Sequence, residues 1–168
     1  MEIRDSYGYR DNLNYGIIGN CQSSALIYKD SSIDWCCFPK FDSPSIFAKI
    51  IDNSNGGFFK VDTVGNYNIS QEYLKNTCIL KTAFNNGFDE FHIIDYMPRY
   101  QTKKKSYYSP PEITRIIKYI KGNPKIRITY DPRLDYSIGK TRSYDKSNFI
   151  VSISENENYE TLYLYLSL

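Results

Sequence analysis

The chain has 168 residues, of which 41% are hydrophobic and 24% charged, a composition typical of one soluble globular domain. Its net charge of +2 is too small for the concentrated basic face of a nucleic-acid-binding protein, and no apolar run approaches the roughly 20 residues that cross a membrane. Aromatic residues make up 16% of the chain, including 17 tyrosines, and this share favours β-strands.

The first sixteen residues are polar and charged, so we expect an extended lead-in and no secretory signal. The four cysteines, Cys21, Cys36, Cys37 and Cys78, show no CxxC spacing and have no histidine close by in the sequence. We therefore expect buried thiols in a reducing compartment, and the cytoplasm is the expected location. No metal or other cofactor is expected.

Two β-rich runs, 24–28 and 33–38, flank the polar segment Lys29-Asp30-Ser31-Ser32 and predict a β-hairpin. Pro39 should end the second strand, because proline cannot donate a hydrogen bond to the neighbouring strand. After Pro44 the apolar residues fall at 46, 47, 50 and 51, and this spacing predicts a short helix over 45–51. Asp42 or Ser43 would cap this helix.

The rest of the chain is a series of short alternating segments separated by turns. Asn85-Asn86-Gly87 is a strong hairpin signal, because both residue types tolerate a positive φ. We expect a mobile loop over 97–111 and a further loop over 137–147. Roughly ten short strands and one helix predict an all-β fold, an antiparallel β-sandwich. The strands are expected over 58–61, 67–73, 78–84, 88–96, 113–120, 125–130, 149–153 and 162–166.

The sequence ends inside the apolar alternation of Leu162, Leu164 and Leu166. We expect this strand either to continue in a longer protein or to pair with another chain. A homo-oligomer formed through this C-terminal edge strand is one form of the second expectation.

Several motifs occur in a fixed order along nearly the whole chain. Together they resemble the N-terminal domain of trehalase-like and glucoamylase-like hydrolases of glycoside hydrolase family 15. Three positions depart from the family pattern: Asn20 stands for the usual Asp, Ser31 for Gly and Lys40 for Arg. The motifs are Ile18-Gly19-Asn20-Cys21, Ser24-Ala25-Leu26, Asp30-Ser31-Ser32-Ile33-Asp34-Trp35, Pro39-Lys40-Phe41-Asp42-Ser43-Pro44, Phe47-Ala48, Ile94-Asp95-Tyr96-Met97-Pro98, Pro111-Glu112-Ile113-Thr114-Arg115 and Asp131-Pro132-Arg133-Leu134-Asp135-Tyr136.

The resemblance implies that residues 1–168 form one non-catalytic, super-sandwich-like domain, which could be incomplete. In the family this domain precedes an (α/α)6 barrel that carries the two catalytic glutamates of an inverting hydrolase. The expected partner is therefore such a barrel, in cis or in trans, and the expected ligands are α-glucosides such as trehalose or maltooligosaccharides. No nucleic acid and no membrane is expected as a partner.

The candidate site runs from Trp35 to Ser43 and has two interpretations. Lys40, Phe41, Asp42 and Ser43 could lie on a loop that faces substrate or the barrel, since aromatic rings beside polar groups suit sugars. Alternatively, Trp35 fills the core, Asp42 or Ser43 caps the helix, and Lys40 is solvated.

Other charged residues have structural interpretations. An ion pair between Asp34 and Arg133 is expected, His92 is expected to be structural, and the run 103–105 of three lysines is expected to be a solvated loop. No acidic residue stands in an acid/base motif, so catalysis by this chain alone is not expected. The acidic candidates considered are Asp34, Asp42, Asp89, Glu90, Asp95, Asp131 and Asp135.

Two alternatives to the supporting domain stay open. The first is a free-standing carbohydrate-binding sandwich that presents Trp and Tyr rings to sugars. The second is a nucleic-acid-binding β-barrel, which the small net charge disfavours.

Overall fold

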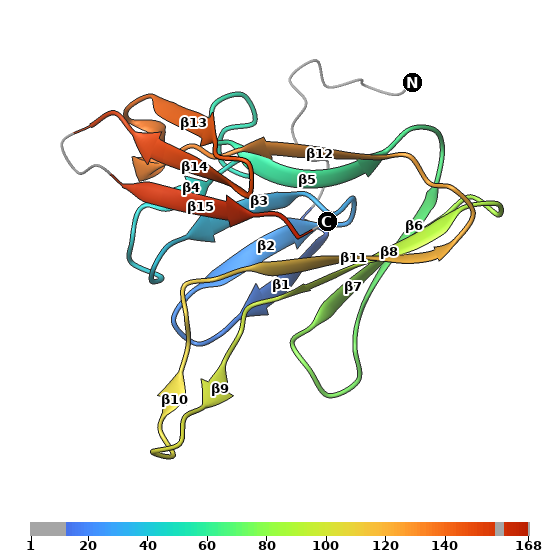
Figure 1. Ribbon diagram of the computed structural model, residues 1–168, viewed down its shortest axis with the longest axis horizontal. Coiled ribbons are helices and arrows are strands. Elements are labelled where there is room, and N and C mark those ends of the chain that lie inside the picture. The colour runs from blue at the N-terminus through green and yellow to red at the C-terminus, as the bar shows by residue number, and fades with distance from the viewer. Residues whose placement is uncertain (1–12, 157–159, 168) are drawn as a thin grey trace.

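The computed structural model describes residues 13–156 and 160–167, which form fifteen strands and one short 3-10 helix (Figure 1). All strand pairs are antiparallel, so the predicted all-β antiparallel class is confirmed. The elements are β1 (Tyr15–Gly19), β2 (Ser24–Tyr28), β3 (Ile33–Cys37), β4 (Ser45–Phe47), β5 (Phe58–Thr63), β6 (Asn68–Tyr73), β7 (Leu80–Asn85), β8 (Glu90–Tyr96), β9 (Tyr100–Gln101), β10 (Tyr107–Tyr108), β11 (Thr114–Lys121), β12 (Ile126–Asp131), η1 (Asp135–Ser137), β13 (Thr141–Asp145), β14 (Phe149–Ser154) and β15 (Thr161–Tyr165).

Two larger sheets and two smaller ones organise the chain. A six-stranded sheet has the order β1-β2-β3-β5-β12, with β4 added to β3, and a four-stranded sheet has the order β11-β8-β7-β6. Strands β13, β14 and β15 form a third sheet, and β9 and β10 form a small hairpin that projects from the body (Figure 1). The predicted hairpins β2–β3 and β7–β8 are both present.

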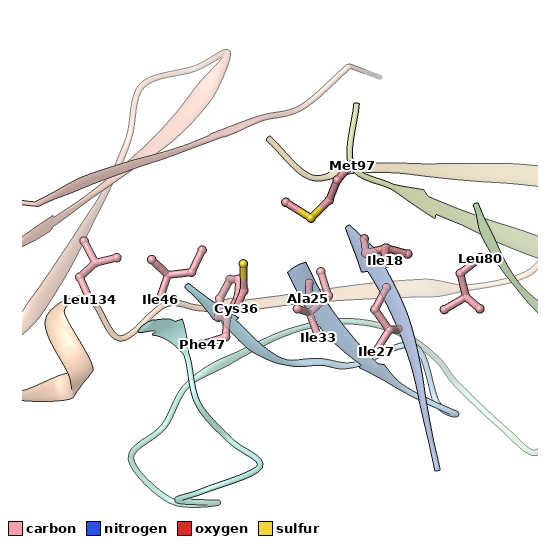
Figure 2. Packing of buried hydrophobic residues seen from close by; sticks show 10 residues of the cluster. All are labelled: Ile18, Ala25, Ile27, Ile33, Cys36, Ile46, Phe47, Leu80, Met97 and Leu134. Atoms are coloured by element: carbon pink, nitrogen blue, oxygen red, sulfur yellow. The ribbon is translucent and has the colours of Figure 1, made fainter. Parts of the chain in front are cut away.

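The core lies between the two larger sheets, as in a sandwich. One cluster of buried side chains, shown in Figure 2, joins residues of β1 to β4 to Leu80 of the four-stranded sheet and to Met97 and Leu134. A second cluster joins Val61 of β5 to residues of β7 and β8, where the Phe84 and Phe91 rings stack with centroids 4.7 Å apart. Leu162 of β15 packs against the first cluster, so the third sheet contacts the same core.

The helix predicted over 45–51 is wrong. Ser45–Phe47 forms β4, which pairs with Cys36 and Cys37 of β3, and a turn follows it. A seven-residue helix would gain few internal hydrogen bonds for its nucleation cost, whereas β3 offers a free backbone edge beyond its single pairing with β5. No described residue is in an α-helix, and the only helical turn is η1.

Two predicted loops contain strands. The segment 97–111 includes the β9–β10 hairpin, in which the Tyr100 and Tyr108 rings lie 5.6 Å apart, and the segment 137–147 includes β13. These strands were missed because they are short or polar and lack an apolar alternation. The expected lead-in begins outside the described residues, and its end, Tyr15-Gly16, belongs to β1.

The prediction of buried thiols holds for half of the cysteines. Cys36 and Cys37 are buried, but Cys21 and Cys78 are exposed. Burial raises the pKa of both buried thiols, which keeps them protonated and unreactive at neutral pH. Within the two described ranges, no helix is long and apolar enough to cross a bilayer.

Candidate functional site

The indole of Trp35 lies on the outer face of the six-stranded sheet, not in the core. Its cross-strand neighbours on β2 and β1 are Leu26 and then Ile17, whereas the next row, Cys36, Ala25 and Ile18, is buried in the core cluster. The alternative in which Trp35 fills the core is therefore wrong.

Trp35 instead lines a cavity of about 270 Å³, which we call the Trp35 pocket. It combines aromatic rings with hydroxyl, amide and carboxylate groups. The lining residues are Trp35, Ser45, Ala48, Ile51, Asp52, Asn55, Gly56, Tyr136 and Ser137.

One wall of the Trp35 pocket is the turn that follows β4. The Ala48 amide donates to the Gly56 carbonyl (2.7 Å), and the Gly56 amide donates to the Asp52 carbonyl (2.8 Å). A side chain at Gly56 would place its Cβ 2.2 Å from the Ala48 carbonyl oxygen, so this turn requires glycine. Hydrogen bonds from the Asn55 side chain, and then from the Asn55 and Ser54 amides, lower the pKa of Asp52, so the pocket contains an anionic carboxylate.

A second wall is the 3-10 turn η1, which contacts the first wall through Ser137 and Asn55. All three of its residues, Asp135, Tyr136 and Ser137, have positive φ values of 51°, 55° and 61°, a conformation that non-glycine residues rarely adopt. Contacts from three sides hold this turn: the Asp135 amide donates to Glu160 Oε2 (3.1 Å), Ser137 Oγ donates to the Asn55 carbonyl (3.0 Å) and the Tyr136 hydroxyl donates to the carbonyl of Ser43 (3.4 Å). Such strain of about 1–3 kcal/mol per residue persists only where the surroundings enforce it, and it is concentrated at functional sites.

Ser45 contributes an unsatisfied hydroxyl. Its residue is only 1% exposed, and its Oγ has no hydrogen-bond partner among the described residues. An unpaired buried polar group costs about 1–3 kcal/mol, so native structures rarely keep one without a ligand or a water to satisfy it. Ser45 is one of the residues that line the Trp35 pocket, but its Oγ is itself enclosed and does not open onto the pocket.

The predicted site residues divide into two groups. Trp35 lines the pocket, while Lys40, Phe41 and Asp42 lie on an exposed turn after the cis Phe38–Pro39 peptide bond, with Phe41 60% exposed. Ser43 is half-buried and joins the two groups through the Tyr136 hydroxyl. Neither Asp42 nor Ser43 caps a helix. A contact of this segment with substrate or with another domain stays a prediction.

Sequence reasoning missed most of the Trp35 pocket. Ser45 and Asp52 were assigned to a helix and to a turn, and Tyr136 belonged to a motif with no assigned role. The one signal for this pocket in the sequence was the aromatic Tyr136 in the motif 131–136. Because Tyr136 lies about a hundred residues after Trp35, nothing in the sequence indicated that the two side chains line the same pocket.

The expected ion pair between Asp34 and Arg133 is absent. Arg133 pairs with Asp131 (3.0 Å), while Asp34 is buried and accepts hydrogen bonds from the Tyr15 hydroxyl (3.0 Å) and from Ser32.

The structure instead joins two motifs that lie twenty residues apart. The buried guanidinium of Arg115 donates two bonds to the buried carboxylate of Asp95 (2.7 and 3.1 Å). It also donates to the Phe59 carbonyl (2.9 Å) and to the Ser31 carbonyl (2.6 Å), so it connects the two larger sheets.

The Trp35 pocket holds no carboxylate pair. Inverting glycosidases need an acid and a base about 6.5–9.5 Å apart on opposite sides of the sugar, but Asp52 is the one acidic residue that lines this cavity. Elsewhere, His92 lies 3.1 Å from Glu90, and its structural role stays a prediction. Across the described ranges no three His, Cys, Asp or Glu side chains form a group that could hold a metal ion.

Comparison with known proteins shows which family the chain matches. The family model described as "Trehalase-like, N-terminal" matches residues 13–158. A trehalase of Thermoplasma volcanium is 32% identical over 137 residues, which cover 79% of this chain and 21% of the relative. Trehalase 2 of Sulfolobus acidocaldarius is 38% identical over 86 residues, which cover 51% of this chain and 14% of the relative.

A more distant match extends further along the chain. A trehalase of Mycobacterium tuberculosis is 24% identical over 176 aligned positions, which cover 92% of this chain and 25% of the relative. The chain thus spans about a fifth of the length of the curated relatives that it matches. No solved structure gives a significant match.

Proposed function

The chain belongs to the family of trehalase-like N-terminal domains, and we propose that it is the non-catalytic β-sandwich domain of a trehalase-type α-glucoside hydrolase of glycoside hydrolase family 15. In this role it packs on a catalytic (α/α)6 barrel, in cis or in trans, and helps to shape that barrel's active site. The observation that carries the proposal is the limited match: the relatives are named trehalases, but only 14–25% of their length corresponds to this chain.

The outer face of the six-stranded sheet supports a contact with another domain. Ile17 and Phe41 are exposed there or on the adjoining loop, Ile51 is exposed at the rim of the Trp35 pocket, and Leu26 and Trp35 are half-buried. Contiguous exposed apolar side chains of this kind mark protein contact surfaces. The same face contains the Trp35 pocket, so a barrel docked on the loop 38–43 would bring its active site near the pocket mouth.

The substrate class follows from the names of the relatives and stays part of the proposal: trehalose or a related α-glucan. A cytoplasmic location also stays part of it, because free thiols are typical of reducing compartments.

A chimera tests the proposal. The segment of the Thermoplasma volcanium trehalase that matches this chain is deleted in one variant and replaced by residues 13–158 of this chain in another. We expect the deletion to abolish glucose release from trehalose and the chimera to restore it, while this chain alone releases none. Full activity of the deletion variant, or hydrolysis by this chain alone, would overturn the proposal.

A matched pair of variants then locates the contact. Phe41→Ser in the chimera should lower activity or domain association, because Phe41 lies on the loop beside Trp35. Phe88→Ser is the control: Phe88 is the same residue type and is even more exposed, but it lies in the turn between β7 and β8. Equal effects of the two substitutions would contradict the assignment of this surface.

A further inference from the structure

We propose that the Trp35 pocket is itself a binding site for one hexopyranose ring, formed entirely by this chain. This assigns a ligand to a cavity that the supporting role alone does not require. The choice of an α-glucoside as the sugar rests on the proposed function, whereas the site rests on the geometry of the pocket.

The lining chemistry suits a sugar. A pyranose has apolar C–H faces that pack on aromatic rings and a rim of hydroxyls that need donors and acceptors. Trp35 and Tyr136 supply the rings, and Asp52, Asn55 and Ser137 supply polar groups around them. These groups bond to one another, since Asp52 accepts from Asn55 and Ser137 Oγ donates to the Asn55 carbonyl, and their remaining lone pairs can accept from sugar hydroxyls.

The size and charge of the pocket limit the ligand. Its volume of about 270 Å³ lies just below the range of about 300–1,000 Å³ that accommodates drug-sized molecules, so it fits one ring and not a long oligosaccharide. No lysine or arginine lines it, and Asp52 is anionic, so phosphorylated or acidic sugars are disfavoured. A neutral sugar is the class that remains.

The strained turn η1 supplies the second ring. Its three left-handed residues place Tyr136 beside the pocket, and the turn is held by Ser43, Asn55 and Glu160 before any ligand arrives. A ring that is already held in position loses little conformational entropy on binding, which favours affinity for a small ligand.

Trp35 provides the measurement, because it is the only tryptophan in the chain. The intact chain is titrated with trehalose, maltose and glucose while Trp35 fluorescence is recorded, with sorbitol as an open-chain polyol control. We expect a saturable change in the millimolar range with the pyranoses and none with sorbitol. An unsaturable change, or the same change with sorbitol, would overturn the proposal.

Variants show whether the signal comes from the Trp35 pocket. Tyr136→Ala removes one of the two rings and should weaken binding about tenfold. Tyr144→Ala, which removes an exposed tyrosine of β13, should have no effect. Unchanged affinity in Tyr136→Ala with correct folding would place the sugar elsewhere and overturn the proposal.

These outcomes are separable from those of the chimera. If the chain binds no sugar but the chimera hydrolyses trehalose, the supporting role stands and the pocket assignment is wrong. If the chain binds pyranoses but deletion of the matching segment leaves the relative fully active, the pocket stands and the chain acts as a free-standing carbohydrate-binding module.

Discussion

Ser31 occupies the turn between β2 and β3 with a φ of 71°, in the left-handed region that normally favours glycine. The side chain compensates for this strain, because Ser31 Oγ is buried and donates to the Val61 carbonyl of β5 (2.7 Å). Serine in place of the usual glycine therefore preserves the tight turn and adds a bond to a neighbouring strand.

Two substitutions separate these effects. Ser31→Ala keeps the strained backbone and loses the hydrogen bond, so it should lower the free energy of unfolding by about 1 kcal/mol. Ser31→Gly loses the same bond but relieves about 1 kcal/mol of backbone strain, so its stability should be close to that of the wild type. Urea unfolding followed by Trp35 fluorescence measures both, and equal destabilisation by the two substitutions would contradict this account.

Asn20 shows a similar adjustment at a second departure from the family pattern. Its Nδ2 donates to the Pro110 carbonyl (2.8 Å), while its Oδ1 accepts from the amides of Gln22 and Ser23 (both 3.1 Å). An ionised aspartate could accept both amides but could not donate to a carbonyl. The amide thus suits the contact with Pro110, because its side chain both donates and accepts.

The stability of the protein at acidic pH depends in part on the hydrogen bonds to Asp89. The amide of Asn123 and then the Tyr67 hydroxyl donate to its carboxylate (2.8 and 3.1 Å), and these bonds lower its pKa although partial burial opposes them. A lowered pKa in the folded state stabilises the protein above the unfolded value of about 3.9, and this contribution is lost as the pH falls through the folded pKa.

Asp89→Asn should therefore flatten the acid limb of the stability curve. The wild type should lose more stability than this variant when the pH falls below about 4, measured by urea midpoints across the acid range. Asp145→Asn removes the same charge from the exposed end of β13 and serves as the control. Parallel curves for the wild type and Asp89→Asn would contradict the assignment.

At the scale of elements, Arg115 of β11 connects the two larger sheets. Besides its fork to Asp95 of β8, it reaches the carbonyls of Phe59 and Ser31, and its guanidinium lies 4.8 Å from the centre of the Phe59 ring. Removing one member of such a buried pair leaves the other as an uncompensated charge.

Asp95→Asn should accordingly destabilise the fold by about 3–5 kcal/mol. Arg115→Lys keeps the charge but cannot reproduce the planar fork, so we expect a loss of about 2 kcal/mol. The control is Arg127→Lys, which alters an exposed pair with Asp62 (3.0 Å) and should cost less than about 1 kcal/mol. A loss for Asp95→Asn as small as that of the control would show that the pair does not hold the sheets together.

The elements that could be predicted from the sequence are those with a local signal. Asn85-Asn86-Gly87 predicts its hairpin because Gly87 adopts a φ of 92° there, and the β2–β3 hairpin has both alternation and a polar turn. Strand β4 could not be predicted, because its local spacing favours a helix and only the free edge of β3 decides the outcome.

The residues of the candidate site also divide into those with a local sequence signal and those that only tertiary packing brings together. Trp35 was identified because a lone tryptophan beside polar turn residues is locally unusual. Tyr136 lies about a hundred residues further along the chain and reaches the pocket only through the packing of η1 against the turn after β4. Likewise, both Asp95 and Arg115 lay within predicted motifs, but their pairing depends on the register of β8 and β11.

At the scale of the whole molecule, the described residues leave the side of the sandwich between β11 and β12 uncovered. Strand β11 is at one edge of the four-stranded sheet, β12 is at one edge of the six-stranded sheet, and the two strands follow each other along the chain (Figure 1). Ile117, Tyr119 and Ile128 lie opposite the buried residues Ile93, Phe91 and Val61, so they face the space between the sheets. They are nevertheless 37%, 63% and 44% exposed.

Inward-facing apolar residues beside unpaired strand edges favour association. We expect the wild-type chain to self-associate, and the double variant Ile117→Lys with Ile128→Lys to shift it towards monomer in sedimentation velocity. Because both side chains are already partly exposed, the double variant should keep the fold with a loss of about 1–2 kcal/mol.

Two matched variants distinguish this edge from the rest of the surface. Ile116→Lys changes the outer face of the same strand, and Tyr165→Lys changes the C-terminal strand β15, where self-association was expected from the sequence. If the open side drives association, neither should have the effect of the double variant. If Tyr165→Lys alone yields monomer, β15 is the contact. A wild-type chain that stays monomeric at every concentration tested would contradict association through the open side and association through β15 alike.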